Sequence, residues 1–421
     1  MANPSDAASA AVEDDAARLA AELAWGAVDS LPAGALAEKL RTAAREGRQL
    51  RVKLGIDPTA PDIHLGHAVV LGKLRQFQDA GQRVVLIVGD YTARVGDPSG
   101  RSELRPMLSQ AEIDANAATF KEQALLILDD DPERLEVRRN GEWLDLPMEE
   151  LLRLVATTTA AQLLEREDFA RRMAAGTPIS MLELLYPLLQ GYDSVAVRAD
   201  VELGGTDQKF NLLLGRDIQR AYGQPGQAIM TMPILAGTDG RRKMSKSLGN
   251  QIGVTDSPQE MYGKTMAIPD EAMGEYRRLL VEPHERATAG SSGQAGQPAW
   301  SELAPRDAKR ALARELVGWL HSPADAAAAE ARFDRVHVQR QAPREVQEAS
   351  VPVQDGVVHL PGVIAQEFGI SRSEARRLID QGGVTLGEQA LGAGEHDIAA
   401  ERANGQLLKV GRRRFRRLRV G

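Results

Sequence analysis

Two histidines three residues apart, His64 and His67, are the first side chains in this chain whose spacing could do chemistry. The stretch around them, RVKLGIDPTAPDIHLGH, predicts a buried strand over 51–56, a Pro-rich turn and a helix that opens near Asp62. Both imidazoles would project from one face of the first helical turn. Free N–H groups and the helix dipole there favour a phosphate. Gly66 would let a flat base press against the backbone. Taken alone, the pair is a weak signal, and two capping surface histidines are the favoured interpretation.

A glycine-flanked loop over 237–250, GTDGRRKMSKSLGN, is the second candidate. It carries Lys243, Ser245, Lys246 and Ser247 and shows no apolar period. Paired lysines and hydroxyls on such a loop suit a polyphosphate, because they combine point charges, rotatable donors and a closing motion. An ordinary solvated basic loop has the same composition, so the loop by itself leaves both interpretations open.

A third candidate is a row of polar side chains on one helix. A capping box from Ser180 to Glu183 predicts a helix start, and Tyr186, Gln190 and Asp193 follow at i, i+4 and i+7. Such a row is usually a solvated face, and it matters only if a pocket lies opposite.

A double glycine follows the short predicted strand over 201–203, in the sequence GGTDQ. Glycine here permits close backbone approach to a ligand, although it could also serve the turn alone. We expect Thr206 or Asp207 to cap the next helix, with Asp207 and Gln208 at the mouth of the site.

The elements around His64 form a β-α-β unit over 51–90. Val70, Leu74 and Phe77 give the helix a core-facing stripe, and Gly81 stands where a C-cap glycine is expected. The run VVLIV over 84–88 is typical of a parallel strand buried on both faces. Ligands of such sheets bind at the carboxyl ends of strands, and the histidine turn lies at such an end.

Further elements are expected around this unit. A helix over 36–46 should end at Gly47, and 111–128 should be helical. A strand over 135–138 should be followed by a tight turn at Asn140-Gly141, and a long helical stretch should cover 147–173.

Composition sets the class of protein. The chain has 421 residues, 43% hydrophobic and 26% charged, which is typical of a soluble globular protein with two or three domains. No apolar run is long enough for a membrane span, and Glu13, Asp14 and Asp15 argue against a targeting peptide. The absence of cysteine excludes disulfides and thiolate zinc sites, so a cytoplasmic location is the default.

Basic residues are concentrated at the C-terminal end, although the net charge is −7. This asymmetry favours a polyanion partner, with a solvated basic tail as the alternative. After Asp256 two helical stretches, 258–280 and 304–336, predict a small helical domain. From Val357, short strands and a second capping box at 371–374 predict another small unit.

The motifs together resemble a known family. PTAPDIHLGH and KMSKS, roughly 180 residues apart, resemble the two signature motifs of the class I aminoacyl-tRNA synthetases, with Leu65 in place of a more frequent isoleucine. GDPSGRS, YPLLQGYD and GGTDQ are similar to the tyrosyl-tRNA synthetase family, in the bacterial branch that keeps a full KMSKS. The resemblance runs from about Leu31 to the C-terminus.

The resemblance implies a Rossmann-like α/β catalytic domain over 51–255, after an N-terminal leader and helix over 1–50. A helical anticodon-binding domain would cover 256–345, and an α+β RNA-binding domain of the alpha-L type would cover 357–421. The family activates L-tyrosine with ATP to tyrosyl-AMP and pyrophosphate, then transfers tyrosine to the terminal ribose of tRNA(Tyr). It is homodimeric, with the stretch near 150–175 as a candidate interface.

The resemblance also assigns residue roles. Catalytic roles in stabilising the departing pyrophosphate fall to His64, His67, Arg101, Arg105, Lys243 and Lys246. ATP contacts fall to Thr59, His64, Gly66, His67, Gly205, Asp207, Lys243, Met244, Ser245, Lys246 and Ser247. Tyrosine contacts fall to Lys53, Asp57, Asp97, Tyr186, Gln190, Asp193, Glu202 and Gln208. RNA contacts fall to Arg372, Arg376, Arg377, Arg412, Arg413, Arg414, Arg416 and Arg417.

The chain departs from the family pattern at three of these positions. Many members have a tyrosine that contacts the substrate phenol where this chain has Lys53, and a glutamine where it has Glu202. Our hypothesis is that these two form an ion pair beneath the pocket, which leaves Asp193 as the main phenol contact. Arg101 stands where many relatives have lysine, which keeps the charge but changes the donor geometry.

The chemistry of the family suits these residue types. The substrate carboxylate is already ionised and attacks the α-phosphorus of ATP, so no general base is needed. Cations and N–H donors must position the reactants and stabilise charge on the pyrophosphate. Mg²⁺ would be bound mainly through the ATP phosphates, with no protein metal site.

Two alternatives remain at this point. A tryptophanyl-type synthetase shares the fold, but Asp193 and the C-terminal unit argue against it. An RNA-binding paralogue that has lost activation is disfavoured by the intact His64, His67, Lys243 and Lys246.

Overall fold

The computed structural model describes residues 4–58, 62–97, 109–288, 300–338, 347–387, 389–411 and 414–420. The chain divides into two compact units, Met1–His321 and Ser322–Gly421. The finer division into four segments stays a prediction. None of the described helices is long and apolar enough to cross a membrane.

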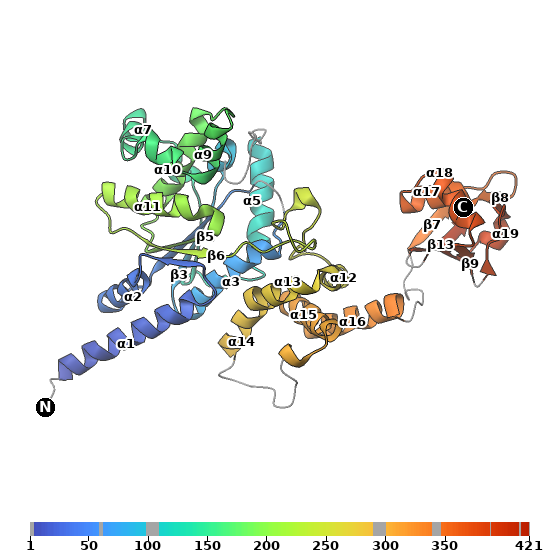
Figure 1. The fold of residues 1–421 in the computed structure, drawn as a ribbon, viewed down its shortest axis with the longest axis horizontal. Helices are drawn as coiled ribbons and strands as arrows, with labels where there is room; N and C mark the ends of the chain where they lie inside the picture. Colours follow the sequence, from blue (N-terminus) through green and yellow to red (C-terminus); the bar gives the residue numbers. More distant parts are fainter. Residues whose placement is uncertain are drawn as a thin grey trace. The chain divides into compact units, whose positions relative to one another are not determined.

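A six-stranded sheet is the centre of the first unit, with strand order β1-β6-β5-β2-β3-β4 (Figure 1). The strands are β1 (Asp29–Leu31), β2 (Arg51–Ile56), β3 (Arg83–Val88), β4 (Leu135–Arg139), β5 (Val201–Gly205) and β6 (Ala228–Met232). Neighbours from β6 to β4 pair in parallel, as the Rossmann-like prediction requires. The edge strand β1 pairs with β6 antiparallel and was not predicted. A three-residue strand carries too little alternation to be recognised from sequence.

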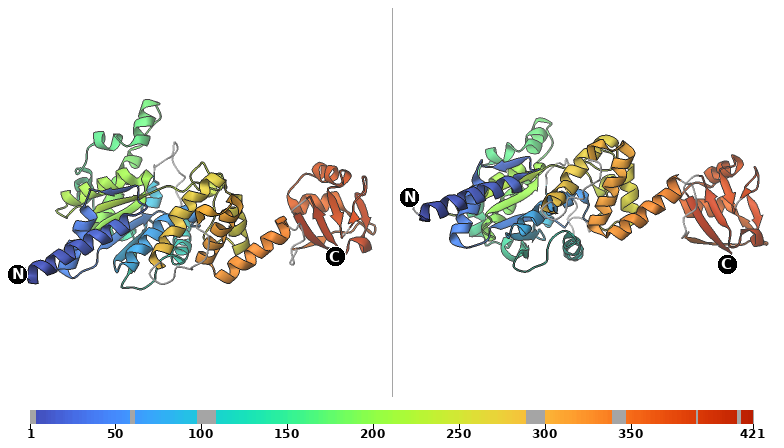
Figure 2. Two further views of the ribbon diagram at one scale, coloured as in Figure 1. Left: turned by 60° about the horizontal axis from the view of Figure 1, so that its bottom comes forward. Right: turned by 90° about the horizontal axis from the view of Figure 1, so that it is seen from below.

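Helices cover both faces of this sheet, and the two views in Figure 2 show the same layers. The helices that precede β6 along the chain are α1 (Pro4–Ala24), α2 (Ala35–Glu46), α3 (Leu65–Asp79), α4 (Thr92–Val95), α5 (Gln110–Ala124), α6 (Gly141–Leu144), α7 (Met148–Val155), α8 (Ala160–Leu164), α9 (Glu167–Ala174), α10 (Met181–Ala196), η1 (Thr206–Gln208) and α11 (Lys209–Ala221). After the sheet come η2 (Lys246–Leu248), α12 (Pro258–Ala267), α13 (Asp270–Tyr276), η3 (Arg277–Val281), α14 (Glu282–Thr288), η4 (Trp300–Glu302) and α15 (Pro305–Leu320).

The β-α-β unit around the histidines is confirmed, and its strands pair in register from Arg51 opposite Arg83 to Ile56 opposite Val88. Gly81 adopts a positive φ of 77° directly after the end of α3, the left-handed conformation that glycine accepts most readily. The helix of 36–46 also ends as predicted, at Gly47. The strand β3 is buried along almost its whole length, as expected for a parallel strand covered on both faces.

Four local predictions were wrong. The helix after the Pro-rich turn begins at Leu65 rather than near Asp62. Asn140-Gly141 makes no hairpin turn, because β4 pairs in parallel with β3 and runs directly into α6. Thr206 and Asp207 do not cap α11, since both belong to the short helix η1 and Gln208 is the N-cap residue of α11. The Asp207 carboxylate instead accepts from Lys243. The long helical stretch over 147–173 is three helices, because Thr159 forms a capping box that starts α8.

The second unit is a separate α+β structure. Its strands β7 (Glu348–Val351), β9 (Val384–Leu386), β10 (Gln389–Ala390), β12 (Leu407–Val410) and β13 (Arg414–Val420) form a five-stranded sheet, and β8 (Val357–His359) pairs with β11 (Asp397–Ala399). Its helices are α16 (Pro323–Phe333), η5 (Asp334–Val338), α17 (Leu360–Phe368), α18 (Arg372–Asp380) and α19 (Ala400–Ala403). Apolar residues of α17 and α18 share one core with this sheet. The helix start predicted at Ser371 is confirmed, because the Ser371 hydroxyl accepts the Glu374 N–H. The reciprocal bond of a capping box is not formed, since the Glu374 carboxylate pairs with Arg377.

Candidate active site

The polar candidates of the first unit meet at one edge of the sheet. Asp57 follows β2, Asp97 comes after β3, and Gly205 ends β5. Because these strands are parallel, their carboxyl ends lie on the same side. Helix α10 packs closely on α11 and brings its polar row to this edge.

The two histidines lie in contact at the start of α3. Their rings stack with centroids 3.9 Å apart, and the His64 backbone N–H donates to His67 Nδ1 at 3.3 Å. Burial lowers the pKa of His64 to about 4, and burial also lowers the pKa of His67 well below its usual range. Both rings are therefore neutral near pH 7 and can serve as N–H donors, not as cations. A Cβ at Gly66 would lie 3.0 Å from the His64 ring, so glycine leaves the ring its space.

The lysine-rich loop lies beside this histidine turn. His64 forms a β-bridge with Gly253, and the Leu65 N–H donates to the Ile252 carbonyl at 2.9 Å. Since the loop over 237–250 directly precedes these residues, the chain anchors it at the start of α3. The structure therefore brings the two signature motifs together, although they are far apart along the chain.

Both lysines of the loop form ion pairs with carboxylates. Lys243 Nζ contacts Asp207 Oδ2 at 2.6 Å, and Lys246 pairs with Asp62. The lysine side chains are 59% and 52% exposed, so water screens both pairs and they can exchange partners easily. Of the other loop residues, Ser245 and Ser247 bond each other through their hydroxyls at 3.0 Å, and Met244 is buried.

Asn250 holds this loop and was missed by the sequence analysis. Its Oδ1 accepts the Ser245 N–H at 2.8 Å, and its Nδ2 donates to Asp239 Oδ2 at 3.2 Å. Asn250 is buried. An asparagine that follows a glycine-rich loop gives no periodic signal, so only its burial shows this role.

Asp57 lies at the centre of a second group of polar contacts. Tyr186 donates its hydroxyl to Asp57 Oδ2 at 2.9 Å, and Thr92 donates to Oδ1 at 2.7 Å. Burial, with a smaller contribution from the nearby carboxylates Asp97 and Asp193, raises the pKa of Asp57 to about 7 against the lowering effect of the two hydroxyls. This carboxyl therefore changes charge near neutral pH.

Asp193 is held from both sides. Trp143 Nε1 donates to Oδ1 at 2.8 Å, and Asn140 Nδ2 makes a longer contact of 3.4 Å to Oδ2. Burial raises the pKa of Asp193 to about 6, so it is ionised at neutral pH. Sequence reasoning missed both donors. They follow the carboxyl end of β4, whose parallel pairing with β3 the sequence analysis did not predict.

The predicted ion pair between Lys53 and Glu202 is present. Lys53 Nζ lies 2.9 Å from Glu202 Oε1, and the two side chains are 0% and 2% exposed. Both residues belong to neighbouring strands, where they are directly opposite each other.

Asn211 links the remaining candidates and was also missed. Its Nδ2 donates to Gln190 Oε1 at 2.9 Å and to Gln208 Oε1 at 3.1 Å. Gln208 in turn donates to Asp97 Oδ2 at 2.9 Å. Gln190, Gln208 and Asp97, which were predicted from separate motifs, thus belong to one hydrogen-bonded chain in which Asn211 links Gln190 to Gln208.

Other predicted residues divide into those described and those not. A Cβ at Gly205 would lie 2.6 Å from Asp207 Oδ1, so a side chain there would displace this carboxylate. Thr59, Arg101 and Arg105 lie outside the described residues.

The arginines of the second unit differ in their surroundings. Arg372, Arg376 and Arg377 are exposed on α18, although Arg377 pairs with Glu374. Arg414 is exposed on β13, and Arg417 donates to the Gly405 carbonyl at 2.9 Å. Arg416 bonds Glu367 at 2.9 Å and lies over the Phe368 ring, so it is partly used within the fold. Arg412 and Arg413 lie outside the described residues.

Comparison with known proteins identifies the relatives of the chain. Residues 45–337 match the family model of class I tRNA synthetases (W and Y). The tyrosine--tRNA ligase of Moorella thermoacetica is 50% identical over 411 residues, which cover 97% of each chain. That of Thermotoga maritima is 48% identical over 91% of this chain and 94% of its own.

Solved structures show the same fold. The tyrosyl-tRNA synthetase of Archaeoglobus fulgidus, solved with L-tyrosine, matches with a TM-score of 0.56 and 24% identity. The match covers 75% of this chain and 99% of that one. A C-terminally truncated mitochondrial tyrosyl-tRNA synthetase of Aspergillus nidulans matches with a TM-score of 0.57 and 22% identity, over 78% and 99% of the two chains.

Proposed function

This chain belongs to the tyrosine--tRNA ligase family of the class I tRNA synthetases, and we propose that it activates L-tyrosine with ATP and transfers it to tRNA(Tyr). The observation that carries the proposal is a buried carboxylate, Asp193, at the same sheet edge as a histidine pair and two lysines. A buried hydrogen-bond acceptor selects a phenol, and the histidine N–H donors and lysine cations stabilise the negative charge of a triphosphate.

The proposed first step needs no protein base. The tyrosine carboxylate attacks the α-phosphorus, a P–O bond forms, and the bond to the leaving pyrophosphate breaks. Lys243 and Lys246 would leave their carboxylates and neutralise the pyrophosphate, while His64 and His67 donate neutral N–H bonds. In the second step the terminal ribose hydroxyl of the tRNA attacks the acyl-adenylate, and AMP leaves.

Mg²⁺ would enter with ATP. Among the residues that the structure describes, no group of three or more histidines or carboxylates could hold a metal ion. Lysines and neutral histidines dominate the phosphate end, and this donor set fits phosphates whose magnesium is carried by ATP itself. Arg101 and Arg105 are proposed to assist at the same phosphates.

The amino-acid roles follow the same proposal. Asp97, Tyr186 and Gln190 would hold the α-ammonium, and Asp193 would accept the phenol hydrogen. Asp207 would bind the ribose once Lys243 has left it, and Gly205 would lie against the nucleotide. Lys53 and Glu202 would support the pocket from beneath.

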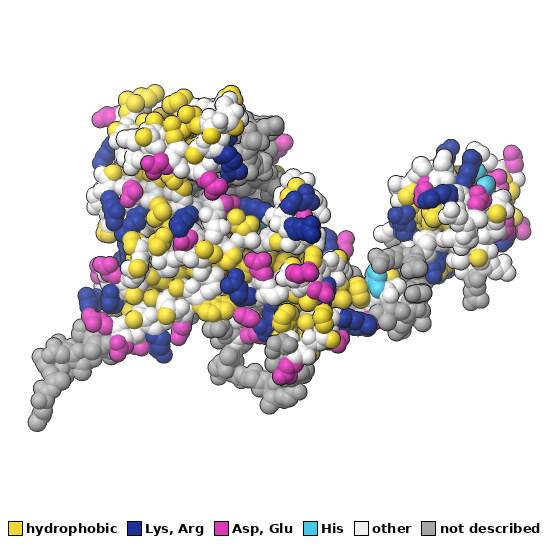
Figure 3. All heavy atoms as spheres, in the orientation of Figure 1, with side chains coloured by type: hydrophobic (Ala, Val, Ile, Leu, Met, Phe, Trp, Pro, Cys, Tyr) yellow, Lys and Arg dark blue, Asp and Glu magenta, His cyan; other side chains and the backbone are white. Residues whose placement is uncertain are grey.

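A homodimer is part of the proposal. Large apolar side chains are exposed over α7 to α10, namely Met148, Leu152, Val155, Met173, Met181 and Leu182. Figure 3 shows hydrophobic side chains gathered over these helices. A second copy of the chain is the occupant that we propose, because the predicted interface near 150–175 overlaps this patch. Leu152→Glu should shift the chain from dimer to monomer in light scattering.

RNA binding is proposed for the second unit. The exposed Arg372, Arg376 and Arg414 are the best placed to contact RNA phosphates. The helices that follow the sheet are proposed to meet the anticodon. The cytoplasmic location also stays a proposal.

ATP–pyrophosphate exchange tests the activity directly. We expect exchange that depends on tyrosine, and none with tryptophan or without amino acid. Exchange with tryptophan alone would favour the tryptophanyl-type alternative. No exchange with any amino acid would favour an RNA-binding paralogue.

A further inference from the structure

We propose that the amino-acid pocket offers the para position of its substrate a hydrogen-bond acceptor and no donor, so that the enzyme also activates phenylalanine derivatives with a neutral para N–H donor. 4-Amino-L-phenylalanine is the simplest member of this class. The inference rests on the proposed function, because it assumes that Asp193 receives the para group of the substrate.

Lys53 is the residue that would be expected to donate there, and its donors are all used. An ammonium carries three hydrogens. In this structure they have three acceptors: Glu202 Oε1 at 2.9 Å, the Gln190 carbonyl at 2.9 Å and Ser194 Oγ at 2.8 Å. The side chain is fully buried. Lys53 is therefore a positioning residue that ties α10 to the sheet.

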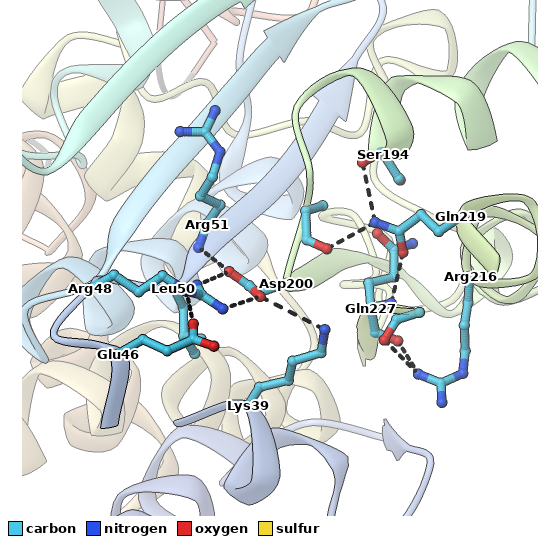
Figure 4. A network of polar contacts seen from close by, with 12 residues as sticks. Lys39, Glu46, Arg48, Leu50, Arg51, Ser194, Asp200, Arg216, Gln219 and Gln227 are labelled. Atoms are coloured by element: carbon cyan, nitrogen blue, oxygen red, sulfur yellow. Dashed lines mark hydrogen bonds and ion pairs between the residues drawn. The ribbon is translucent and has the colours of Figure 1, made fainter. Parts of the chain in front are cut away.

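A closed layer of polar groups holds Lys53 in this arrangement. Glu202 also accepts hydrogen bonds from Ser194 Oγ at 3.1 Å and from Gln227 Nε2. Gln219 accepts the Gln227 N–H at 2.7 Å and donates to the Ser194 carbonyl at 3.2 Å (Figure 4). Turning Lys53 toward a substrate would leave a buried carboxylate without its partner, which is strongly unfavourable.

The other donors near Asp193 are used as well. Trp143 has a single N–H, and it bonds Asp193. Asn140 divides its amide hydrogens between Asp193 and Thr92 Oγ1, the latter at 2.9 Å. Thr92 and Tyr186 give their hydroxyl hydrogens to Asp57. In the part of the chain that the structure describes, the polar hydrogens of Lys53, Trp143, Asn140, Thr92 and Tyr186 are thus all donated to acceptors of the protein.

The acceptor capacity of Asp193 is only half used. Each carboxylate oxygen can accept two hydrogen bonds, and each of these oxygens receives one. A phenol O–H or an arylamine N–H can fill the remaining sites. The arylamine nitrogen is a poor acceptor, because its lone pair is delocalised into the ring, and a pocket without a donor does not require one. A relative with a tyrosine hydroxyl at the Lys53 position would face this nitrogen with an unused donor.

The test is ATP–pyrophosphate exchange by the full chain with four amino acids: tyrosine, 4-amino-L-phenylalanine, 4-fluoro-L-phenylalanine and phenylalanine. We expect the kcat/KM of the arylamine to lie within about 100-fold of that of tyrosine, since a weaker donor still fills the acceptor. The fluoro compound and phenylalanine have no donor and should fall about 10⁴-fold or more below tyrosine. An arylamine no better than phenylalanine would overturn the inference. If tyrosine itself is not activated, the proposed function fails instead.

A double variant supplies the matched control. Lys53→Tyr with Glu202→Gln introduces the pattern of many relatives and places a hydroxyl donor in the pocket. The kcat/KM of the arylamine relative to tyrosine should then fall by about tenfold. An unchanged ratio in a folded double variant would contradict the assignment. If that variant does not fold, the comparison of the four amino acids on the unaltered chain still decides.

Discussion

The proposed amino-acid end of the site, around Asp193 and Lys53, and its proposed phosphate end, around Lys243 and Lys246, are built from similar residue types but in opposite ways. At the amino-acid end, Lys53 and Glu202 are fully buried and bonded on all sides. At the phosphate end, Lys243 and Lys246 are more than half exposed and pair with Asp207 and Asp62. A buried network fixes geometry, whereas exposed pairs can be exchanged for a substrate.

This difference matches the two tasks that we propose. Discrimination between tyrosine and phenylalanine requires a buried hydrogen-bond acceptor that water cannot reach, the role that we propose for Asp193. Stabilising a leaving pyrophosphate requires cations that reach the phosphates as charge develops. Exposed ion pairs contribute at most about 1 kcal/mol, so their separation is a small barrier to closure.

The largest effect is expected from a substitution in the proposed amino-acid end. Asp193→Ala removes the acceptor, so the tyrosine to phenylalanine ratio of kcat/KM should collapse toward about 1–10. Tyrosyl-tRNA synthetases are themselves the standard case of this selectivity, at about 10⁵-fold. Pyrophosphate exchange with both amino acids measures the ratio. Unchanged selectivity would show that the phenol binds elsewhere.

The second prediction tests whether the buried pair is structural. Lys53→Ala leaves Glu202 buried and unpaired, so the free energy of unfolding should fall by about 3–5 kcal/mol. Urea unfolding measures the loss. The control Lys53→Met with Glu202→Met removes both charges and should lose much less. Equal losses in the two variants would argue that the charges are not coupled.

The third prediction breaks only the phosphate end. Lys243→Ala should lower kcat for activation by about 10²–10³, because it removes charge stabilisation in the transition state. The KM for tyrosine should stay nearly constant, and the Tyr/Phe selectivity should be unaffected. A variant that lost selectivity as well would show that the two ends are not independent.

The fourth prediction uses pH. The raised pKa of Asp57, about 7, means that this carboxyl loses its charge as the pH falls below neutral. Since kcat/KM reports the free enzyme, its value for tyrosine should drop about tenfold between about pH 8 and about pH 6. Asp193, with a pKa of about 6, should add a further fall below that. Asp57→Asn should remove the upper step of the profile.

The same shift has a consequence for stability. The folded state binds the Asp57 proton more tightly than the unfolded chain does, so stability from this group is greatest at acid pH. Its contribution to the free energy of unfolding should decline as the pH rises from about 4 to about 7. Asp57→Asn should abolish that decline, and a profile that kept it would assign it to another group.

The smallest expected effect concerns the exchangeable pairs. Asp62→Asn releases Lys246 from its carboxylate, so the KM for ATP should fall about two- to threefold. Asp217→Asn breaks an exposed pair with Arg220 on α11 and serves as the control, with no change in KM. An increase in KM for the Asp62 variant would indicate that Asp62 holds the loop in its productive position.

Much of the architecture could be predicted from the chain alone. The continuous apolar run of β3, the core stripe of α3, the capping box at Ser180 and the N-cap at Ser371 depend on local periodicity and cap chemistry. Such signals are present within a few residues. The ion pair of Lys53 with Glu202 was also predictable, because two departures from one family pattern suggested that they compensate each other.

Most other contacts made by single side chains could not be predicted. Asn140 directly follows β4 and Asn250 follows the short helix η2, neither within a periodic pattern, and Asn211 lies within an ordinary helix. Trp143 was passed over because the preceding residues resembled a hairpin turn. Its true role depends on β4 pairing in parallel beside β3, a pairing that no local signal specifies.

The sequence by itself determined which residue types are available, most of the strands and helices that carry them, and the family. The tertiary structure decided which charges are paired and which atoms remain free. The pairing of each charge depends on its burial and on the packing of α10 and α6 against the sheet. Lys53 is therefore fixed in a buried ion pair, whereas the exposed Lys243 and Lys246 can change partners.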